Sequence, residues 1–547
     1  MKRLKFIIAV LLVWGTASML SIAWAQNPAT IGSIIYNSSI SAYEINSGDN
    51  LKDLAVYVNG TGTYTTGSPE TTAHDCLGLT FKLTSDIEFS YAGLASGASN
   101  FTPIGGEFGN TPFSGTFDGN YHTIRGIRIA STDDCQGLFR SISGATVQNV
   151  VLVDASITGG QNVGCIVGYA LSGTISNCHI AHNVIVTAGV YGSSALGGIV
   201  GLNDGASISG CTSAATITCG DCTACNFYGA IVGANNVGGT IENCLAIAAT
   251  INASSEVGAI IGSNSGTLTK NYYAGCEVYN EGVPGTVGGT SSGDVNINDD
   301  DGAIALDKDK TVTIPLLNSA DNTDVIAAIE AIEGNNFNYQ LIGRTLIKDG
   351  KWNTLCLPFD ATLDGATVME LDGENSNLTG GTLTLNFNAV QQIEEKTTLT
   401  AGKPYIVKWT SDSPNPSFSK VSIGATTASE VSFTGGKFVG TYGWQEFTEE
   451  DKSILFMGDD NMLYYPEAGA QIGAQRAYFQ LNTTNPVKSF VLNFGEESAL
   501  SGVSTLLANR REVGGEATLF TLAGRRVTNS HLPHGIYVSK GKKVFVK

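Results

Sequence analysis

The stretch 163–275 contains one short phrase four times: GCIVG at 164–168, GGIVG at 197–201, GAIVG at 229–233 and GAIIG at 258–262. The closing glycines of these copies lie 33, 32 and 29 residues apart. Self-similarity at a period of this length is the sequence signature of solenoids and propellers. The fold class of this part of the chain therefore follows from the repeat.

Each copy consists of short runs of β-branched residues that alternate with polar ones. Gly, Asn, Ser and Asp separate these runs, which is typical of strands joined by tight turns. Helical repeats would need segments of about 10–15 residues with apolar residues three and four apart, and the repeat has none. A unit this small cannot bury its own apolar face, so it must stack on its neighbours.

We therefore predict a right-handed parallel β-helix in which each repeat makes one coil. A propeller blade needs about four strands in about 40–45 residues, so a propeller is the second choice. Stacked coils would align the first isoleucine of each copy in one interior file: Ile166, Ile199, Ile231 and Ile260. A second phrase, such as GTIENC at 239–244, would add another file: Ile175, Ile208, Ile241 and Leu268.

The pattern G-G-I-V-G-x-N-x-G-x-I-x-N-C resembles the GLUG motif of bacterial adhesin-like surface proteins. The segments GIVGLN at 198–203 and GSNSG at 262–266 match the motif closely. This resemblance implies the repeat architecture and, more loosely, a surface or adhesive role. It implies no catalytic residues.

The composition fits a loop-rich β protein and argues against one class of partner. Glycine accounts for 67 of 547 residues, about 12% against a usual ~7%. The formal net charge is −19, and Lys270 is the only Lys or Arg between Ser141 and Thr290. Without a basic face, nucleic acid is not an expected partner.

Residues 1–25 have the form of a signal peptide. Three basic residues among the first five precede an apolar run at 6–14, and Ala23-Trp24-Ala25 has the A-x-A form of a cleavage site. Cleavage between Ala25 and Gln26 would leave a secreted, outer-membrane or cell-surface protein. No later run reaches ~18 apolar residues, so we expect no transmembrane span in the mature chain.

The fold that we expect is all-β: a right-handed parallel β-helix followed by an antiparallel β-sandwich and a small C-terminal β tail. Strand-like runs recur about every ten residues in the second part, which favours a sandwich. The expected segments are the signal peptide at 1–25, the β-helix at 26–285, a linker at 286–310, the sandwich at 311–498 and the tail at 499–547.

Two short helices are predicted. The first runs from Ser47 to Gly60, with Ser47 or Asp49 as its cap. It would cover the open end of the first coil, because solenoids need their apolar ends covered; an ordinary amphipathic helix is the alternative. The second covers Asn322–Gly334, where Val325, Ile326 and Ile329 share one side.

Two segments of the second half resemble known bacterial modules. Residues 343–359 resemble a module found in surface proteins of the Bacteroides group, which implies no function. The last ~45 residues, with LFTLAGRRV at 519–527 and a basic end at 543–547, resemble the C-terminal sorting domain of the type IX secretion pathway. This implies that export machinery is a partner of the tail. A small β tail without a sorting role is the alternative.

Three cysteines hold the same position in successive repeats: Cys178, Cys211 and Cys244. Stacking would place them about 4.8 Å apart, which allows a disulfide between neighbours. Buried free thiols are the other interpretation, and the one that we favour, since Cys packs as a small hydrophobe.

Two further segments contain residues of the types that bind metal ions. Cys219, Cys222 and Cys225 could hold zinc or an iron–sulfur cluster, but a fourth ligand is missing and exported proteins favour disulfides. Asp294–Asp301 faintly resembles a calcium loop, yet Asp299 stands where the EF-hand needs glycine. We therefore predict no metal and no cofactor, and treat Asp294–Asp301 as linker.

No catalytic residues are predicted. His179 and His182 lie three apart without a third ligand, which favours two surface histidines. The acidic residues of the coils are not repeated in register, so they suggest no glycosidase pair: Asp154, Asp204, Asp221, Glu242 and Glu256. Three tryptophans of the second part could stack on sugars, although a core role is more usual: Trp352, Trp409 and Trp444.

The predicted function is that of an exported, non-enzymatic, adhesin-like surface protein whose β-helix acts as a rigid stalk or binding face. Host or microbial surface glycans or proteins are its expected partners. The alternative is a carbohydrate-binding or polysaccharide-degrading β-helix protein, which cleavage of a polymer would reveal.

Overall fold

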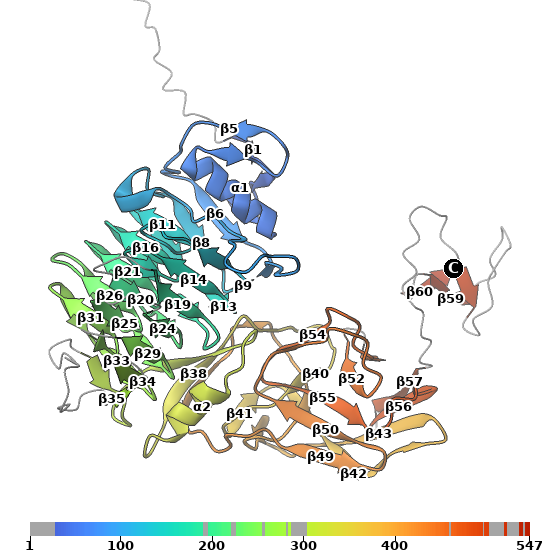
Figure 1. Cartoon of the computed structure of the whole chain (residues 1–547). Helices are drawn as coiled ribbons and strands as arrows, with labels where there is room; N and C mark the ends of the chain where they lie inside the picture. Colours follow the sequence, from blue (N-terminus) through green and yellow to red (C-terminus); the bar gives the residue numbers. More distant parts are fainter. Residues whose placement is uncertain are drawn as a thin grey trace, which may run out of the picture.

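The protein is all-β, with a parallel β-solenoid followed by sheets in a sandwich-like arrangement, as the computed structural model shows (Figure 1). The described residues are 28–189, 195–219, 226–253, 257–280, 283–285, 303–458, 461–495, 497–502, 519–521, 535–539 and 542–546. Outside them lie the predicted signal peptide, Cys222, Cys225 and the Asp294–Asp301 segment.

Each coil of the solenoid contributes one strand to each of several parallel sheets. Each strand pairs in register with the equivalent strand of the next coil. Neighbouring coils therefore place these residues beside one another: Ile175, Ile208, Ile241 and Leu268. One representative coil consists of β16 (Val167–Ala170), β17 (Gly173–Ser176), β18 (His179–Ile180), β19 (Ile185–Ala188) and β20 (Ala195–Gly197).

The repeated isoleucines form the predicted file. The backbone N–H of Ile166 donates to the carbonyl of Ile199 at 3.0 Å, Ile199 to Ile231 at 2.9 Å, and Ile231 to Ile260 at 3.0 Å. All four side chains are fully buried. The prediction of stacked coils is therefore confirmed.

A ladder of asparagines accompanies the apolar files. The Asn203 side-chain amide donates to Asn235 Oδ1 at 2.8 Å, and that of Asn235 donates to Asn264 Oδ1 at 2.8 Å. Asn203 and Asn235 are buried. Buried amides need such partners, so this repeat position specifies the stacking register as well as the turn.

The first helix, α1 (Gly48–Asn59), covers the start of the solenoid, as predicted. Ser47 caps it by accepting a hydrogen bond from the Asn50 N–H, and Gly60 ends it with φ +65°. Such a left-handed residue favours glycine. The apolar face of α1, including Leu51 and Leu54, belongs to the same core cluster as the coils.

The second part contains two main sheets that enclose an aromatic core. Phe387 of the larger sheet meets Phe479 of the smaller one edge to face, with ring centroids 6.4 Å apart. The six-stranded sheet comprises β40 (Asn353–Leu355), β46 (Tyr405–Lys408), β42 (Thr367–Thr379), β43 (Thr382–Ala389), β56 (Ser489–Phe494) and β57 (Glu497–Gly502). The five-stranded sheet comprises β49 (Glu430–Phe433), β50 (Gly436–Thr441), β55 (Arg476–Leu481), β52 (Ile454–Met457) and β53 (Leu463–Tyr464).

A third, smaller sheet lies next to the solenoid. It is formed by β37 (Thr313–Leu317), β38 (Phe337–Ile342) and β48 (Ser417–Val421). The helix α2 (Thr323–Glu330), shorter than its predicted range, connects β37 and β38. The pairs β37–β38 and β43–β56 are parallel, a departure from the otherwise mostly antiparallel pattern of this part.

The second part packs against one sheet of the solenoid (Figure 1). Val151 and Val153 of this docking sheet form an apolar cluster with Leu317 and Ile342, while Leu245 belongs to the core cluster of the second part. The docking sheet comprises β7 (Ile87–Glu88), β9 (Thr123–Arg125), β13 (Val151–Val153), β18, β23 (Thr212–Ser213), β28 (Leu245–Ile247), β33 (Asn271–Ala274) and β36 (Ala303–Ala305).

Two segments near the predicted boundaries complete the fold. Strand β36 pairs with β33, so residues 303–305 extend the docking sheet into the range that we expected to be linker. Near the C-terminus, β58 (Leu519–Thr521), β59 (Gly535–Ser539) and β60 (Lys542–Val546) form a three-stranded antiparallel sheet. No helix among the described residues is long and apolar enough to cross a membrane.

Candidate functional site

A cleft of about 560 Å³ separates the first coils from the second part of the molecule. Its position follows from the outward side chains of the docking sheet. Val151 and Val153 are apolar and closely covered, whereas the preceding strand presents Thr123 and Arg125 in the same two columns. Thr123 and Arg125 are nevertheless buried, and both contact Ser319 of the second part. The cleft therefore opens beyond this strand, where the exposed Asp86 and Glu88 line it.

Arg125 crosses the cleft and joins the two parts. Its guanidinium lies over the Trp444 ring, 3.6 Å from the centroid, and donates a hydrogen bond to the Ser319 carbonyl oxygen. The side chain is buried, and burial lowers the pKa of this guanidinium. A cation–π contact that is shielded from water contributes about 2 kcal/mol. Arg125 is therefore a positioning residue for Trp444.

Asp86 forms the solenoid edge of the cleft. Its Oδ1 accepts from the Thr123 N–H at 2.9 Å and lies 3.1 Å from His122 Nδ1. Partial desolvation raises the pKa of Asp86, but the hydrogen bonds from His122 and Thr123 outweigh it and hold the pKa below its usual value. A general acid needs the opposite shift, so Asp86 is suited to accepting hydrogen bonds.

The opposite wall comes from the second part. Gln471 Nε2 in β54 (Gln471–Ile472) donates to Glu88 Oε2 at 3.5 Å, and Arg476 donates to Asn318 Oδ1 at 3.4 Å. Both contacts are long, so both are weak. A Cβ on Gly473 would lie 2.5 Å from Asn318 Oδ1. Gly473 therefore permits this close approach of backbone and side chains.

The three tryptophans take different places. Trp352 is 3% exposed and stacks on Phe494 with ring centroids 5.0 Å apart, which is a core role. Trp409 is partly buried against the core of the second part. Trp444 is half-buried and lines the cleft. Trp352 also borders the cleft, but it is almost fully buried, so Trp444 offers the more accessible indole there.

His179 is not a surface histidine, and that prediction was wrong. It is 6% exposed on the docking sheet, with Nδ1 2.9 Å from Thr212 Oγ1 and its ring stacked near Tyr121. Burial lowers its pKa to about 4. His182 is partly exposed, and its Nε2 lies 3.4 Å from Asp324 Oδ2 in α2. Both histidines thus lie where the second part meets the solenoid.

The repeated cysteines are buried free thiols. Cys178, Cys211 and Cys244 each lie within 3.5 Å of the carbonyl oxygen two residues earlier in the chain. Burial raises the pKa of the Cys178 and Cys244 thiols, so they are poor nucleophiles. The described residues contain no group of three or more His, Cys, Asp or Glu side chains that could hold a metal.

The acidic residues of the central coils form no pair. Asp204 accepts from the Tyr169 hydroxyl at 2.8 Å, Asp154 lies 3.5 Å from Arg128, and Glu242 is exposed. Asp221 and Glu256 lie outside the described residues. Each of the three described carboxylates therefore acts by itself.

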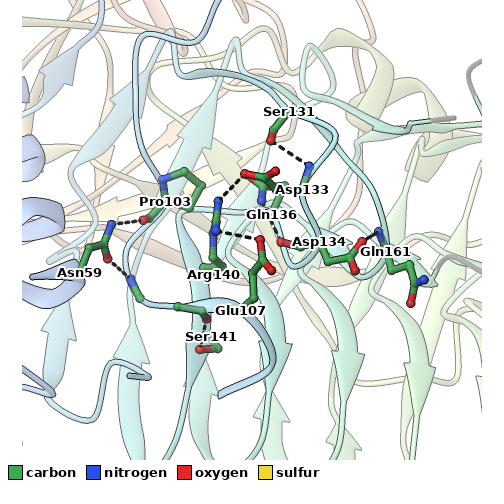
Figure 2. Close-up of polar contacts among 12 residues, drawn as sticks. Asn59, Pro103, Glu107, Ser131, Asp133, Asp134, Gln136, Arg140, Ser141 and Gln161 are labelled. Carbon is green, nitrogen blue, oxygen red and sulfur yellow. Dashed lines mark hydrogen bonds and ion pairs between the residues drawn. The ribbon is translucent and has the colours of Figure 1, made fainter. Parts of the chain in front are cut away.

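A second polar network lies on the first coils (Figure 2). Arg140 forms ion pairs with Glu107 at 3.0 Å and with Asp133 at 3.3 Å, and Asn59 at the end of α1 bonds to the loop at Pro103 and Gly105. These contacts hold loops of neighbouring coils to the covering helix. The charges are used within the protein, so this cluster is structural.

Sequence reasoning did not identify Arg125, Asp86 or Glu88 as site residues. A signal did exist: outward positions of an otherwise apolar solenoid sheet carry charge at Glu88 and Arg125, which pair in register. Charged residues on a face that is elsewhere buried point to a functional or interface role. These two charges can be recognised as unusual only when it is known which solenoid sheet the second part covers.

Comparison with known proteins supports the repeat. Residues 192–218 match the model of the GLUG motif. Halomucin from Haloquadratum walsbyi is 38% identical over 102 residues, which are 18% of this chain and 1% of halomucin. The match thus covers a very small part of that protein.

A solved structure also aligns with about half of this chain. It is the crystal structure of a candidate immunoglobulin A1 protease from Bacteroides ovatus, 21% identical, with a TM-score of 0.33 over 47% of this chain and 83% of that one. The family-model match and the stacked coils together make this chain a β-solenoid protein that carries the GLUG motif.

Proposed function

We propose that this protein is an exported, non-enzymatic, adhesin-like surface protein. The solenoid serves as a rigid stalk, and the second part serves as a head fixed to its side. The observation that carries the proposal is the continuous register of buried isoleucines and asparagines through successive coils. Such a one-dimensional stack keeps its ends apart, which suits display away from a membrane better than turnover of a substrate.

Export is supported by the pattern of residues 1–25, by the match to the GLUG motif and by the β tail. The tail would engage the export machinery, and surface glycans or proteins would be bound by the exposed parts. The apolar contacts of Val151, Val153 and Leu245 support the rigid attachment of head to stalk.

The test is surface display and adhesion. Antibodies against residues 311–498 should label intact cells that produce the full chain, and these cells should adhere better than cells without it to glycan-coated or protein-coated surfaces. Removal of residues 1–25 should abolish the label. Absence of surface label from the intact chain, or cleavage of any polysaccharide or protein by the purified chain, would contradict the proposal.

A further inference from the structure

The cleft between the first coils and the second part has the size and position of a binding site. Its volume of about 560 Å³ falls within the range of ~300–1,000 Å³ typical of small-molecule sites, which often lie at domain interfaces. Both parts of the molecule contribute to its walls, Glu88 and Arg125 from the solenoid and Gln471 from the second part among them. A ligand there would touch stalk and head at once.

The charges of the cleft favour a neutral ligand. Three acidic and three basic side chains line it: Asp86, Glu88, Asp349, Arg125, Lys351 and Arg476. Several are already engaged within the protein. Lys351 pairs with Asp349 at 3.6 Å, and Arg125 is used by Trp444 and Ser319. A charged ligand would therefore meet no excess of the opposite sign.

The cleft nevertheless keeps hydrogen-bonding capacity. Glu88 and Gln471 are exposed, and the 3.5 Å contact between them is at the limit of a hydrogen bond. Each therefore has acceptor positions to offer, and the carboxylate can make the stronger, charge-assisted bonds. The half-buried Trp444 adds an indole N–H, which is a hydrogen-bond donor, to the cleft lining. These groups suit a ligand that carries several hydroxyl groups.

Apolar surface lies beside these polar groups. Trp444, Phe456, Met457 and Ile347 line the cleft, and Ile347 is 49% exposed. An aromatic ring with a polar atom suits a ligand that is apolar on one face and polar at its edge. A sugar ring has this combination, with C–H groups on its face and hydroxyls around it.

We propose that the cleft binds a neutral glycan of about one to three sugar units, the length that a site of this volume accommodates. Trp444 contacts the sugar with the part of its indole that Arg125 leaves uncovered, and Arg125 is the positioning residue that holds this ring. Glu88 and Gln471 accept hydrogen bonds from hydroxyls. This proposal rests on the proposed function in one respect: the glycan is taken to belong to the surface to which the protein adheres.

The experiment is calorimetric titration of the purified full chain with defined trisaccharides at millimolar concentration. The neutral probes are maltotriose, xylotriose, mannotriose and tri-N-acetylchitotriose, and sialyllactose is the anionic probe. At least one neutral probe should bind and change the tryptophan fluorescence, whereas sialyllactose should bind at least tenfold more weakly.

Two variants test the location. Glu88→Gln keeps the shape of the side chain but removes the charge from the acceptor, and should weaken binding about tenfold or more. Ile347→Trp fills the cleft from an exposed position and should abolish binding. The matched control is Glu242→Gln, an exposed carboxylate on another solenoid sheet, which should leave the affinity unchanged.

Three results would overturn the inference: no binding of any neutral probe, tighter binding of sialyllactose, or binding that Glu88→Gln and Ile347→Trp leave intact. The circular dichroism of each variant shows whether it folds. If cells that display the Ile347→Trp variant adhere as well as cells that display the wild type, the cleft is not the glycan site. The proposed surface role would still hold. If the wild-type chain is not displayed on the cell surface, the proposed surface role is wrong, but the calorimetric evidence for glycan binding remains valid.

Discussion

The two ends of the docking sheet use the same backbone geometry in opposite ways. At the central coils, Val151, Val153 and Leu245 are covered by apolar residues of the second part. At the first coils, Thr123 and Arg125 occupy the corresponding positions and contact Ser319, and beyond them the interface opens into a cleft. The comparison shows that one solenoid sheet can carry both a closed apolar contact and an open cleft when its outward side chains change.

The largest expected effect comes from a charge in the closed end. Leu245→Asp buries a carboxylate without a partner, which should cost about 4 kcal/mol and separate the two parts. Small-angle scattering should show a larger radius of gyration, and proteolysis should cut near residues 303–312. Val237→Asp, at a solenoid position that is 81% exposed, is the control. An unchanged radius in Leu245→Asp would mean that this end does not hold the parts together.

The next largest expected effect is a pH dependence of the folding stability, caused by a histidine on the docking sheet. His179 has a folded pKa of about 4 against 6.5 in the unfolded chain, so between these values only the unfolded chain binds a proton. Stability is then full above about pH 6.5 and falls as the pH drops towards and through 4, by about 3 kcal/mol in total. Thermal midpoints over this range should fall in the wild type.

The matched pair of variants isolates this effect. His179→Gln should flatten the fall of the midpoint between pH 6.5 and 4, whereas His182→Gln, at the partly exposed histidine of the same interface, should keep it. A fall of equal size in His179→Gln would assign the pH dependence to other groups.

A smaller effect is expected at the boundary between the closed end and the cleft. Arg125→Met removes the contact with Trp444 and the bond to Ser319, and should lower the free energy of unfolding by about 2 kcal/mol. Arg128→Met is the control, since Arg128 stacks on Tyr91 at 4.0 Å within the first coils. Denaturant melts and the fluorescence of Trp444 measure both. Equal losses in the two variants would remove the special role of Arg125.

The smallest effect is expected at the open end. Gln471→Ala removes a single long hydrogen bond to Glu88, so it should change stability by less than about 0.5 kcal/mol. The same melts would measure it. A loss close to that of Arg125→Met would show that the cleft walls also hold the parts together.

The repeat made much of the solenoid predictable. The files of Ile166 and Ile175, the cap at Ser47 and the stop at Gly60 depend on residues close in sequence or one period apart, and the structure has them as expected. The burial of His179 was missed because it depends on tertiary contacts, with Thr212 and Tyr121 of neighbouring coils and a place on the docking sheet. Arg125 and Ser319, which meet at the cleft, lie 194 residues apart.

By itself, the sequence determined that this chain is a stack of glycine-bracketed coils followed by a second β part, because period and alternation are local properties. Only the tertiary structure decided which solenoid sheet the second part covers, where that cover ends and which charged side chains line the resulting cleft. Such docking depends on the match between two surfaces that are distant in the chain, and no periodicity within one segment encodes that match.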